Sequence, residues 1–374
     1  MMPRTKFMQC RAARLVASLM AAMLLFASMP LAVDATSSGN GARWGYKVIG
    51  AKLPYGAYRS SIAWSGEKAY IMTGRDTDEL KGTIIEFDPA KGTTRIMGAR
   101  MEPRIMSTGT WFGDAATGHA YIFGGQKKGN MTDEILMFDP RDDNVTVLPS
   151  RLPEATMGAS AVSDGNYIYV IGGRNVTQHT PAVSKFDPAT GAVTSIPSMP
   201  KAGGGRGAVW TGNSIYLFGN CESGIALSDV HLYDPATGGH PVHVGPVRGF
   251  YWTTAAWTGS SALVFAGNNY TRAFDGVWEF VPGDDPLTGT FEQVAKLPQP
   301  MDLGVSFYDE AGGAAYYLGG ENTTMNGSTA IYEFTKSDAA SGGMQMSSRS
   351  VTVLGVLAVV TLAVVALNAR KTGK

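Results

Sequence analysis

The run Tyr121-Ile122-Phe123-Gly124-Gly125 returns 48 residues later as Tyr169-Val170-Ile171-Gly172-Gly173, and this repetition decides the fold. Equivalent apolar runs occur in four further places, where they end at Gly74, Asn220, Gly267 and Gly320. The six end points are separated by 51, 48, 47, 47 and 53 residues. A fixed period of this length predicts that one small unit of secondary structure is repeated six times.

An aromatic residue is locked to each of these runs. It follows the end point by 13 residues in five copies and by 14 in the last: Phe87, Phe138, Phe186, Tyr233, Phe280 and Phe334. Asp-Pro follows the aromatic in four copies, and residues 187–191 and 234–238 both read Asp-Pro-Ala-Thr-Gly, which is typical of a tight turn. Each unit therefore reads as four short strands, and such units must pack around a common axis to bury both faces.

The repeated pattern resembles kelch repeats of the galactose oxidase central domain superfamily. Besides the glycine-ended runs and the aromatics, several units close with an apolar residue and proline: Leu53-Pro54, Leu152-Pro153, Met199-Pro200 and Leu297-Pro298. The resemblance covers residues 44–335 and implies an all-β, six-bladed kelch-type β-propeller. The 47 glycines favour the many tight turns that such a fold needs.

Ring closure is also readable from the sequence. The sixth unit ends at Phe334 without a fourth strand, whereas residues 44–54 match the fourth strand at 291–298. We expect residues 44–50 to pair with the strand at 330–335, which would complete blade 6 and leave no exposed sheet edge.

The two ends of the chain predict targeting segments. Residues 1–35 carry basic residues, an apolar stretch and a small-residue cleavage site, which is typical of a signal peptide, with an uncleaved anchor as the alternative. Residues 36–43 form a short N-terminal segment, and 336–350 a juxtamembrane linker. Residues 351–367 contain no charge and predict a transmembrane helix, and the basic tail 368–374 places it in the cytoplasm. The chain is thus expected to be a single-pass type I protein of the cell surface or a secretory membrane. The alternatives are a buried core helix and a lipid-anchor signal at Ser341-Gly342-Gly343.

Charge and cysteine content narrow the possible partners. Eight of the 31 Lys and Arg residues and one of the 31 Asp and Glu residues lie outside 36–348, which leaves 23 basic against 30 acidic residues there. Such an acidic domain without a basic stripe makes nucleic acid an unexpected partner.

Once Cys10 leaves with the signal, Cys221 is the one cysteine left in the sequence. It is expected to pack as a small apolar residue, to pair with another chain or to act as a nucleophile.

Six Asn-x-Ser/Thr sequons lie between the predicted signal and anchor. They are Asn130, Asn144, Asn175, Asn269, Asn322 and Asn326. With 12 asparagines in the chain, chance supplies roughly two sequons. The excess predicts an N-glycosylated protein.

No motif in the sequence indicates catalysis, a metal or a cofactor. His240 and His243 lie close together, but no third ligand has a zinc-like spacing. The galactose oxidase type needs a cysteine crosslinked to tyrosine together with histidine ligands, and Cys221 has no clear histidine pair. Some secreted six-bladed kelch proteins resemble sialic acid mutarotases, which gives a second hypothesis by analogy of fold alone.

The resemblance implies a ligand site where the loops converge on the axis. These loops carry arginines that could bind carboxylates, namely Arg59, Arg75, Arg104, Arg174, Arg206, Arg248 and Arg272. The alternative is that the arginines brace neighbouring loops. Tyr251, Trp252 and Tyr270 could stack on a sugar or fill the core.

From the sequence, the leading hypothesis is a membrane-anchored module that binds a protein or a small acidic or glycan ligand. The alternative is a tethered carbohydrate-active enzyme of the mutarotase type. A convergent acid/base pair at the mouth of the axial channel would favour the enzyme, and a charged rim without one would favour binding.

Overall fold

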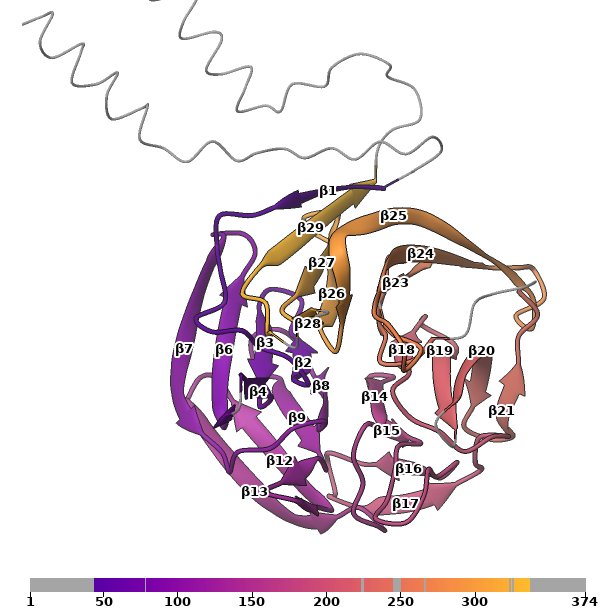
Figure 1. Cartoon of the computed structure of the whole chain (residues 1–374). Helices are drawn as coiled ribbons and strands as arrows, with labels where there is room; N and C mark the ends of the chain where they lie inside the picture. Colours follow the sequence, from indigo (N-terminus) through magenta and orange to yellow (C-terminus); the bar gives the residue numbers. More distant parts are fainter. Residues whose placement is uncertain are drawn as a thin grey trace, which may run out of the picture. The chain divides into compact units, whose positions relative to one another are not determined.

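The computed structural model describes residues 44–336, except 78, 223–224, 245–249, 266, 323 and 325. They form six antiparallel sheets around one axis, with the innermost strand of each sheet beside it (Figure 1). The fold is therefore a six-bladed all-β propeller. We name the strands of each blade A to D from the axis outward.

The blades follow one another along the chain. Blade 1 comprises β2 (Ser61–Trp64), β3 (Ala69–Met72), β6 (Thr83–Asp88) and β7 (Thr93–Arg100). Blade 2 comprises β8 (Thr108–Phe112), β9 (His119–Phe123), β12 (Glu134–Asp139) and β13 (Asn144–Arg151). Blade 3 comprises β14 (Ser160–Ser163), β15 (Ile168–Ile171), β16 (Val183–Phe186) and β17 (Val193–Ile196). Blade 4 comprises β18 (Gly207–Trp210), β19 (Ile215–Glu222), β20 (Ile225–Asp234) and β21 (Gly238–Pro241).

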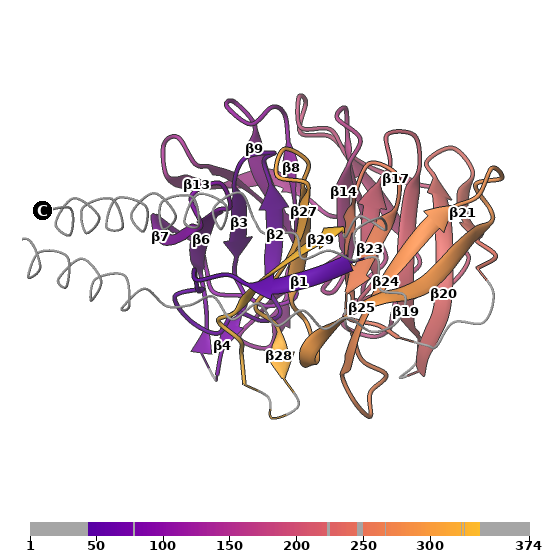
Figure 2. The same ribbon diagram turned by 90° about the horizontal axis from the view of Figure 1, so that it is seen from above.

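The last two blades are joined by a short strand. Blade 5 comprises β22 (Thr254–Trp257), β23 (Ala262–Phe265), β24 (Phe274–Pro282) and β25 (Gly289–Asp302). Blade 6 comprises β26 (Val305–Asp309), β27 (Ala314–Leu318), β29 (Ile331–Lys336) and β1 (Trp44–Val48). Short strands lie in the loops between strands B and C: β4 (Arg75–Asp76), β5 (Glu79–Leu80), β10 (Gln126–Lys127), β11 (Asn130–Met131) and β28 (Glu321–Asn322). We call the face that carries these loops the BC face; β4 and β28 project from it at the lower side of Figure 2.

The N-terminal strand closes the ring. β1 pairs antiparallel with β29 from Trp44 opposite Lys336 to Val48 opposite Tyr332. The start of the described chain thus supplies strand D of blade 6, where the sequence analysis expected it. Pairing the first strand with the last leaves β29 no free edge.

The repeated aromatic residue of strand C packs between neighbouring blades. All six are at most 1% exposed, and each packs on the preceding blade. Phe87 of blade 1, for example, lies 5.5 Å from Tyr316 of blade 6 between ring centroids. Burying one such ring stabilises the fold by about 1.5–3 kcal/mol, so six of them explain why this position is repeated.

Asp143 joins two blades on the opposite face. Its carboxylate accepts hydrogen bonds from the backbone nitrogens of Gly98 (2.6 Å) and Ala99 (2.9 Å) in β7 of blade 1. This contact depends on the register of two neighbouring blades, which the sequence does not show.

Replacing Asp143 by alanine is expected to lower the free energy of unfolding by about 1–3 kcal/mol, because two backbone donors lose a charged acceptor. A thermal or urea melt of the variant measures this. Asp142→Ala, which removes an exposed neighbouring carboxylate, is the matched control. Equal stability of the two variants would contradict a stabilising contact between Asp143 and blade 1.

Within the described part of the chain, no helix has the length and apolar character that a bilayer crossing requires. The predicted signal peptide (1–35), transmembrane helix (351–367) and tail (368–374) lie outside the described residues.

Candidate functional site

A closed ring of backbone hydrogen bonds surrounds the axis on the BC face. One residue from each blade, just before strand A, donates its N–H to the carbonyl of its counterpart in the preceding blade, over 2.7–3.5 Å. The six are Arg59, Met106, Gly158, Gly205, Trp252 and Leu303. All have φ between +55° and +64°. This unusual conformation fixes the direction of the four side chains in the ring.

Two of the ring positions are glycines because Trp252 needs their space. A Cβ at Gly158 would lie 2.9 Å from the Trp252 indole, and one at Gly205 would lie 3.0 Å from it. The indole therefore lies over the blade 3 and blade 4 side of the ring. A cavity of about 930 Å³ runs along the axis and is lined by strand A of every blade and by Trp252. Trp252 thus lies at the end of the cavity on the BC face, which we call the mouth.

A second circle of paired residues surrounds this mouth. The residue before each ring position pairs with the residue after each repeat end point, as Tyr251 pairs with Asn268 and Asp302 with Glu321. In blades 2, 3 and 4 the first member of the pair is Ile105, Met157 or Gly204. In blades 5, 6 and 1 the first member is instead Tyr251, Asp302 or Tyr58.

Two carboxylates and one guanidinium meet on the side of blades 5, 6 and 1. Asp302 is 9% exposed and Glu321 8%, and their backbones are direct strand partners. The Arg59 guanidinium lies 3.6 Å from the Glu321 carboxylate and remains partly exposed. Asn268 donates from Nδ2 to the Asp302 carboxylate.

Asp302 has an unusual affinity for protons. Burial and, to a smaller extent, the nearby Glu321 charge raise the pKa of its carboxyl to about 6, against the lowering effects of Asn268 and Arg59. A carboxyl group that titrates near neutral pH can take up and return a proton, as a general acid or base must.

Three aromatic rings continue the site into blade 5. Tyr251 lies 5.6 Å from Trp252 and 4.3 Å from Tyr270 between ring centroids, and the pair with Tyr270 is stacked. Burial raises the pKa of Tyr251 to about 12, so its phenol is neutral at physiological pH. Carboxylates and aromatic rings are therefore neighbours just outside the ring of backbone hydrogen bonds.

Comparison with known proteins shows which family has repeats of this kind. The family model for the KLHDC2/KLHL20/DRC7 kelch-repeats domain matches residues 59–240. A kelch domain-containing protein of Archaeoglobus fulgidus is 28% identical over 130 residues, which is 34% of this chain and 35% of that protein. This chain is a kelch-repeat β-propeller.

Other relatives of this kelch propeller carry the name N-acetylneuraminate epimerase. Those of two strains of Haemophilus influenzae are each 27% identical over 134 residues, which is 33% of this chain and 33% of theirs. The chain thus matches about a third of the length of these curated relatives. A solved structure titled "Structure of YjhT" superposes with a TM-score of 0.66 and 16% identity, covering 77% of this chain and 97% of that one. At this identity the likeness concerns the fold.

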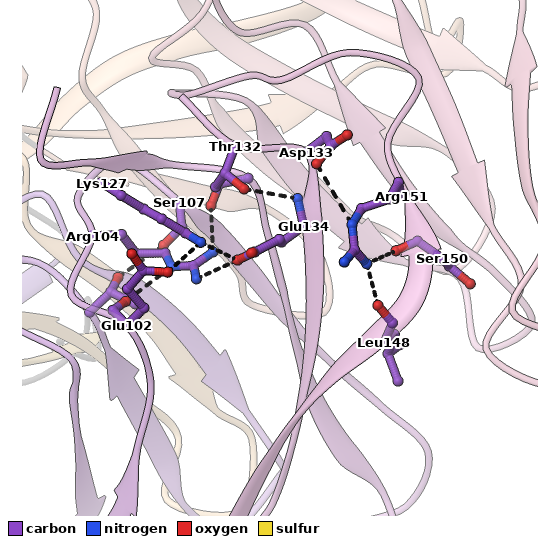
Figure 3. A network of polar contacts seen from close by, with 12 residues as sticks. Glu102, Arg104, Ser107, Lys127, Thr132, Asp133, Glu134, Leu148, Ser150 and Arg151 are labelled. Carbon is purple, nitrogen blue, oxygen red and sulfur yellow. Dashed lines mark hydrogen bonds and ion pairs between the residues drawn. The ribbon is translucent and has the colours of Figure 1, made fainter. Parts of the chain in front are cut away.

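Two of the arginines predicted from the sequence are buried between loops of the kelch propeller. Arg104 is 0% exposed; it donates to the carbonyl of Gly124 (3.3 Å) and lies 2.8 Å from the Glu134 carboxylate, which Lys127 also contacts (Figure 3). Arg206 is 5% exposed and donates to the carbonyls of Gly203 and Lys201. Both guanidiniums occupy the bracing position that the sequence analysis gave as the alternative.

The other predicted site residues are divided around the mouth. Arg59 and Tyr251 lie on the side of blades 5, 6 and 1, whereas the Trp252 side chain extends from blade 5 over Gly205 and Gly158. Arg174 is exposed in blade 3, on the far side of the ring, and Arg248 lies outside the described residues. Sequence reasoning missed Asp302 and Glu321. The signal that could have found them is positional, because one directly precedes a ring position and the other directly follows Gly319-Gly320.

Five of the sequons lie in BC-face loops, and Asn144 begins β13 on the other side. Asn175, Asn269 and Asn322 share one local geometry: the Asn Oδ1 accepts from the hydroxyl of the threonine two residues later, over 2.7–2.9 Å. Glycosylation of the six asparagines stays a prediction.

Proposed function

We propose that this kelch propeller binds a small acidic sugar at the mouth on the BC face and epimerises it at the anomeric carbon. The observation that carries this proposal is the pair Asp302 and Glu321 beside Arg59, with the pKa of Asp302 at about 6. A convergent acid/base pair at this place is the feature that favours an enzyme over a binding module.

The residues suggest a division of roles. Arg59 is partly exposed and would bind the sugar carboxylate by charge-assisted hydrogen bonds. Asp302 would take the proton of the anomeric hydroxyl while the ring C–O bond breaks, and would then return this proton to the ring oxygen, which gives the open-chain ketone. The same steps in reverse close the ring on the other face. The Trp252 indole, which extends from blade 5 across the ring toward Gly205, would carry the apolar face of the sugar.

The comparisons support the substrate class. The N-acetylneuraminate epimerases of Haemophilus influenzae align with about a third of this chain, and N-acetylneuraminate carries a carboxylate at its anomeric carbon. Five sequons around the same mouth also favour a small ligand, because glycans there would hinder a large protein from docking flat.

A receptor that holds the sugar without transforming it is the second candidate. It is favoured by the low exposure of Asp302 and Glu321 and by the hydrogen bond from Asn268, which together limit contact with a substrate.

Exchange NMR separates the two candidates. Full-length protein in detergent is mixed with N-acetylneuraminate at pH 7, and the rate of exchange between the anomers is compared with that of the sugar alone. The enzyme hypothesis expects faster exchange. Saturation transfer from protein to sugar without any gain in exchange would instead identify the receptor.

The catalysed exchange should depend on pH. The pKa of Asp302 is about 6, so the carboxylate that acts as base is mostly ionised at pH 7 and mostly protonated at pH 5. After subtraction of the uncatalysed rate, we expect exchange to fall about tenfold between these values. A flat profile would exclude Asp302 as the titrating base.

We also propose that the propeller is carried on a membrane in the secretory pathway with the type I orientation. The support is the composition of residues 1–35 and 351–374. Protease added to intact cells should remove the propeller and leave a short tail peptide. An epitope after Lys374 that antibody reaches from outside would contradict this orientation.

A further inference from the structure

Tyr270 is a large aromatic residue held in an exposed position at the edge of the proposed site. Its side chain is 50% exposed, and its backbone has φ +71°, which non-glycine residues rarely adopt. The Tyr270 N–H donates to Asn268 Oδ1 (3.1 Å), and the next two residues donate to Asn269 Oδ1. The loop thus fixes the direction of an exposed ring. Such strain is typical of residues that serve a site.

The side chain is held as firmly as its backbone. Its ring stacks on Tyr251 at 4.3 Å, and its hydroxyl contacts the Cys221 sulfur. Cys221 is 2% exposed, and its Sγ lies 3.6 Å from His179 Nε2. Loops of blades 3, 4 and 5 therefore meet at the hydroxyl end, while half of the side chain remains exposed. A ring that is already immobilised loses little entropy when a ligand packs on it.

Asn268 joins this ring to the acid/base residue. Its Oδ1 accepts from the Tyr270 backbone and its Nδ2 donates to the Asp302 carboxylate. A ligand whose anomeric centre reaches Asp302 would therefore extend the opposite side of its ring, which carries the N-acyl group in N-acetylneuraminate, toward Tyr270. The face of the Tyr270 ring is apolar and matches a methyl group better than a hydroxyl.

We propose that Tyr270, positioned by Cys221, selects acidic sugars that carry an N-acyl group over those that carry a hydroxyl at the same carbon. This inference rests on the proposed function and names the determinant of its substrate class. The acyl methyl would pack on the Tyr270 ring. A sugar that lacks this methyl would leave the ring exposed to water. A contact of one methyl group predicts a preference of roughly 5- to 20-fold.

The test compares N-acetylneuraminate with the corresponding sugar acid that carries a hydroxyl in place of the acetamido group. Saturation-transfer NMR gives the two dissociation constants, and exchange NMR gives the two catalysed rates, for full-length protein in detergent. The wild type should prefer the N-acyl sugar in both. Tyr270→Ala should bring the ratio of the two dissociation constants, and the ratio of the two rates, close to one. The dissociation constant and the rate for the hydroxyl sugar should stay at their wild-type values.

Three further variants separate the contributions. Tyr270→Phe keeps the ring and should keep most of the preference. Cys221→Ala removes the contact with the hydroxyl and should lower the preference for the N-acyl sugar without abolishing binding. Val176→Ala is the matched control, because Val176 is the exposed middle residue of the equivalent sequon in blade 3 and should change nothing.

The outcomes distinguish this inference from the proposed function. If the wild type binds and exchanges both sugars equally, or if Tyr270→Ala weakens both equally, the selectivity proposal is wrong and epimerisation stands. If the wild type binds the N-acyl sugar selectively, loses that selectivity in Tyr270→Ala and never accelerates exchange, the selectivity stands and epimerisation is wrong. If neither sugar binds, both fail.

Discussion

Replacing Asp302 by asparagine is expected to lower the catalysed exchange of N-acetylneuraminate anomers by about 100-fold or more, because a positioned proton acceptor contributes roughly that factor. Asparagine preserves the shape and can still accept the hydrogen bond from Asn268. Binding measured by saturation transfer should therefore persist. Loss of catalysis with retained binding is the signature of a group that acts in the reaction rather than in recognition.

Asp309→Asn is the matched control for this variant. Asp309 is 8% exposed, belongs to the same blade as the partner Glu321, and lies at the end of β26 away from the ring residue Leu303. It should leave the exchange rate unchanged. An Asp302→Asn protein with the wild-type rate would rule out Asp302 as the base.

Removing residues 44–50 from the full-length protein is expected to abolish cooperative folding. The deletion eliminates all five residue pairs between β1 and β29 and takes away Trp44, which is 3% exposed in the cluster between blades 5 and 6. The freed edge of β29 would also favour aggregation. Size-exclusion chromatography and a thermal melt measure the loss.

Two substitutions give this experiment a graded form. Trp44→Ala keeps the strand and should lower the free energy of unfolding by about 3–5 kcal/mol, the usual effect of deleting a buried tryptophan side chain. Lys47→Ala removes a half-exposed side chain paired with Glu333 and should change stability by at most about 1 kcal/mol. A deletion variant that melts like the wild type would contradict closure by strand pairing.

The fold was predictable because the repeat fixes both composition and spacing. Each glycine-ended run and each aromatic such as Phe87 recurs at a near-constant distance, and a strand that lacks its partner, at 330–335, has its complement at 44–50. Both features can be read from the order of residues along the chain. They predict the fold because every blade makes the same contacts with its neighbours.

The site was only partly predictable, because it depends on which loops become neighbours. Arg59, Tyr251 and Trp252 lie at the mouth as expected, but whether they bind a ligand remains a prediction. Arg104 and Arg206 lie in the same kind of loop of the repeat as Arg59, so the sequence does not distinguish the three. In the structure, however, Arg104 and Arg206 are buried between loops, and this burial depends on how the loops pack. Asp302 and Glu321 are 19 positions apart in a chain with 31 acidic residues, so nothing in the sequence distinguishes them until strand pairing makes them partners.

A crystal structure of the protein with bound N-acetylneuraminate would show where and how the sugar binds. We expect one sugar at the mouth on the BC face, with its carboxylate on Arg59, its anomeric hydroxyl within hydrogen-bond distance of Asp302 and an apolar face against the Trp252 indole. A sugar bound in the axial cavity below Trp252, on the outer strands of the blades, or at the BC face without contact to Asp302 would contradict this expectation.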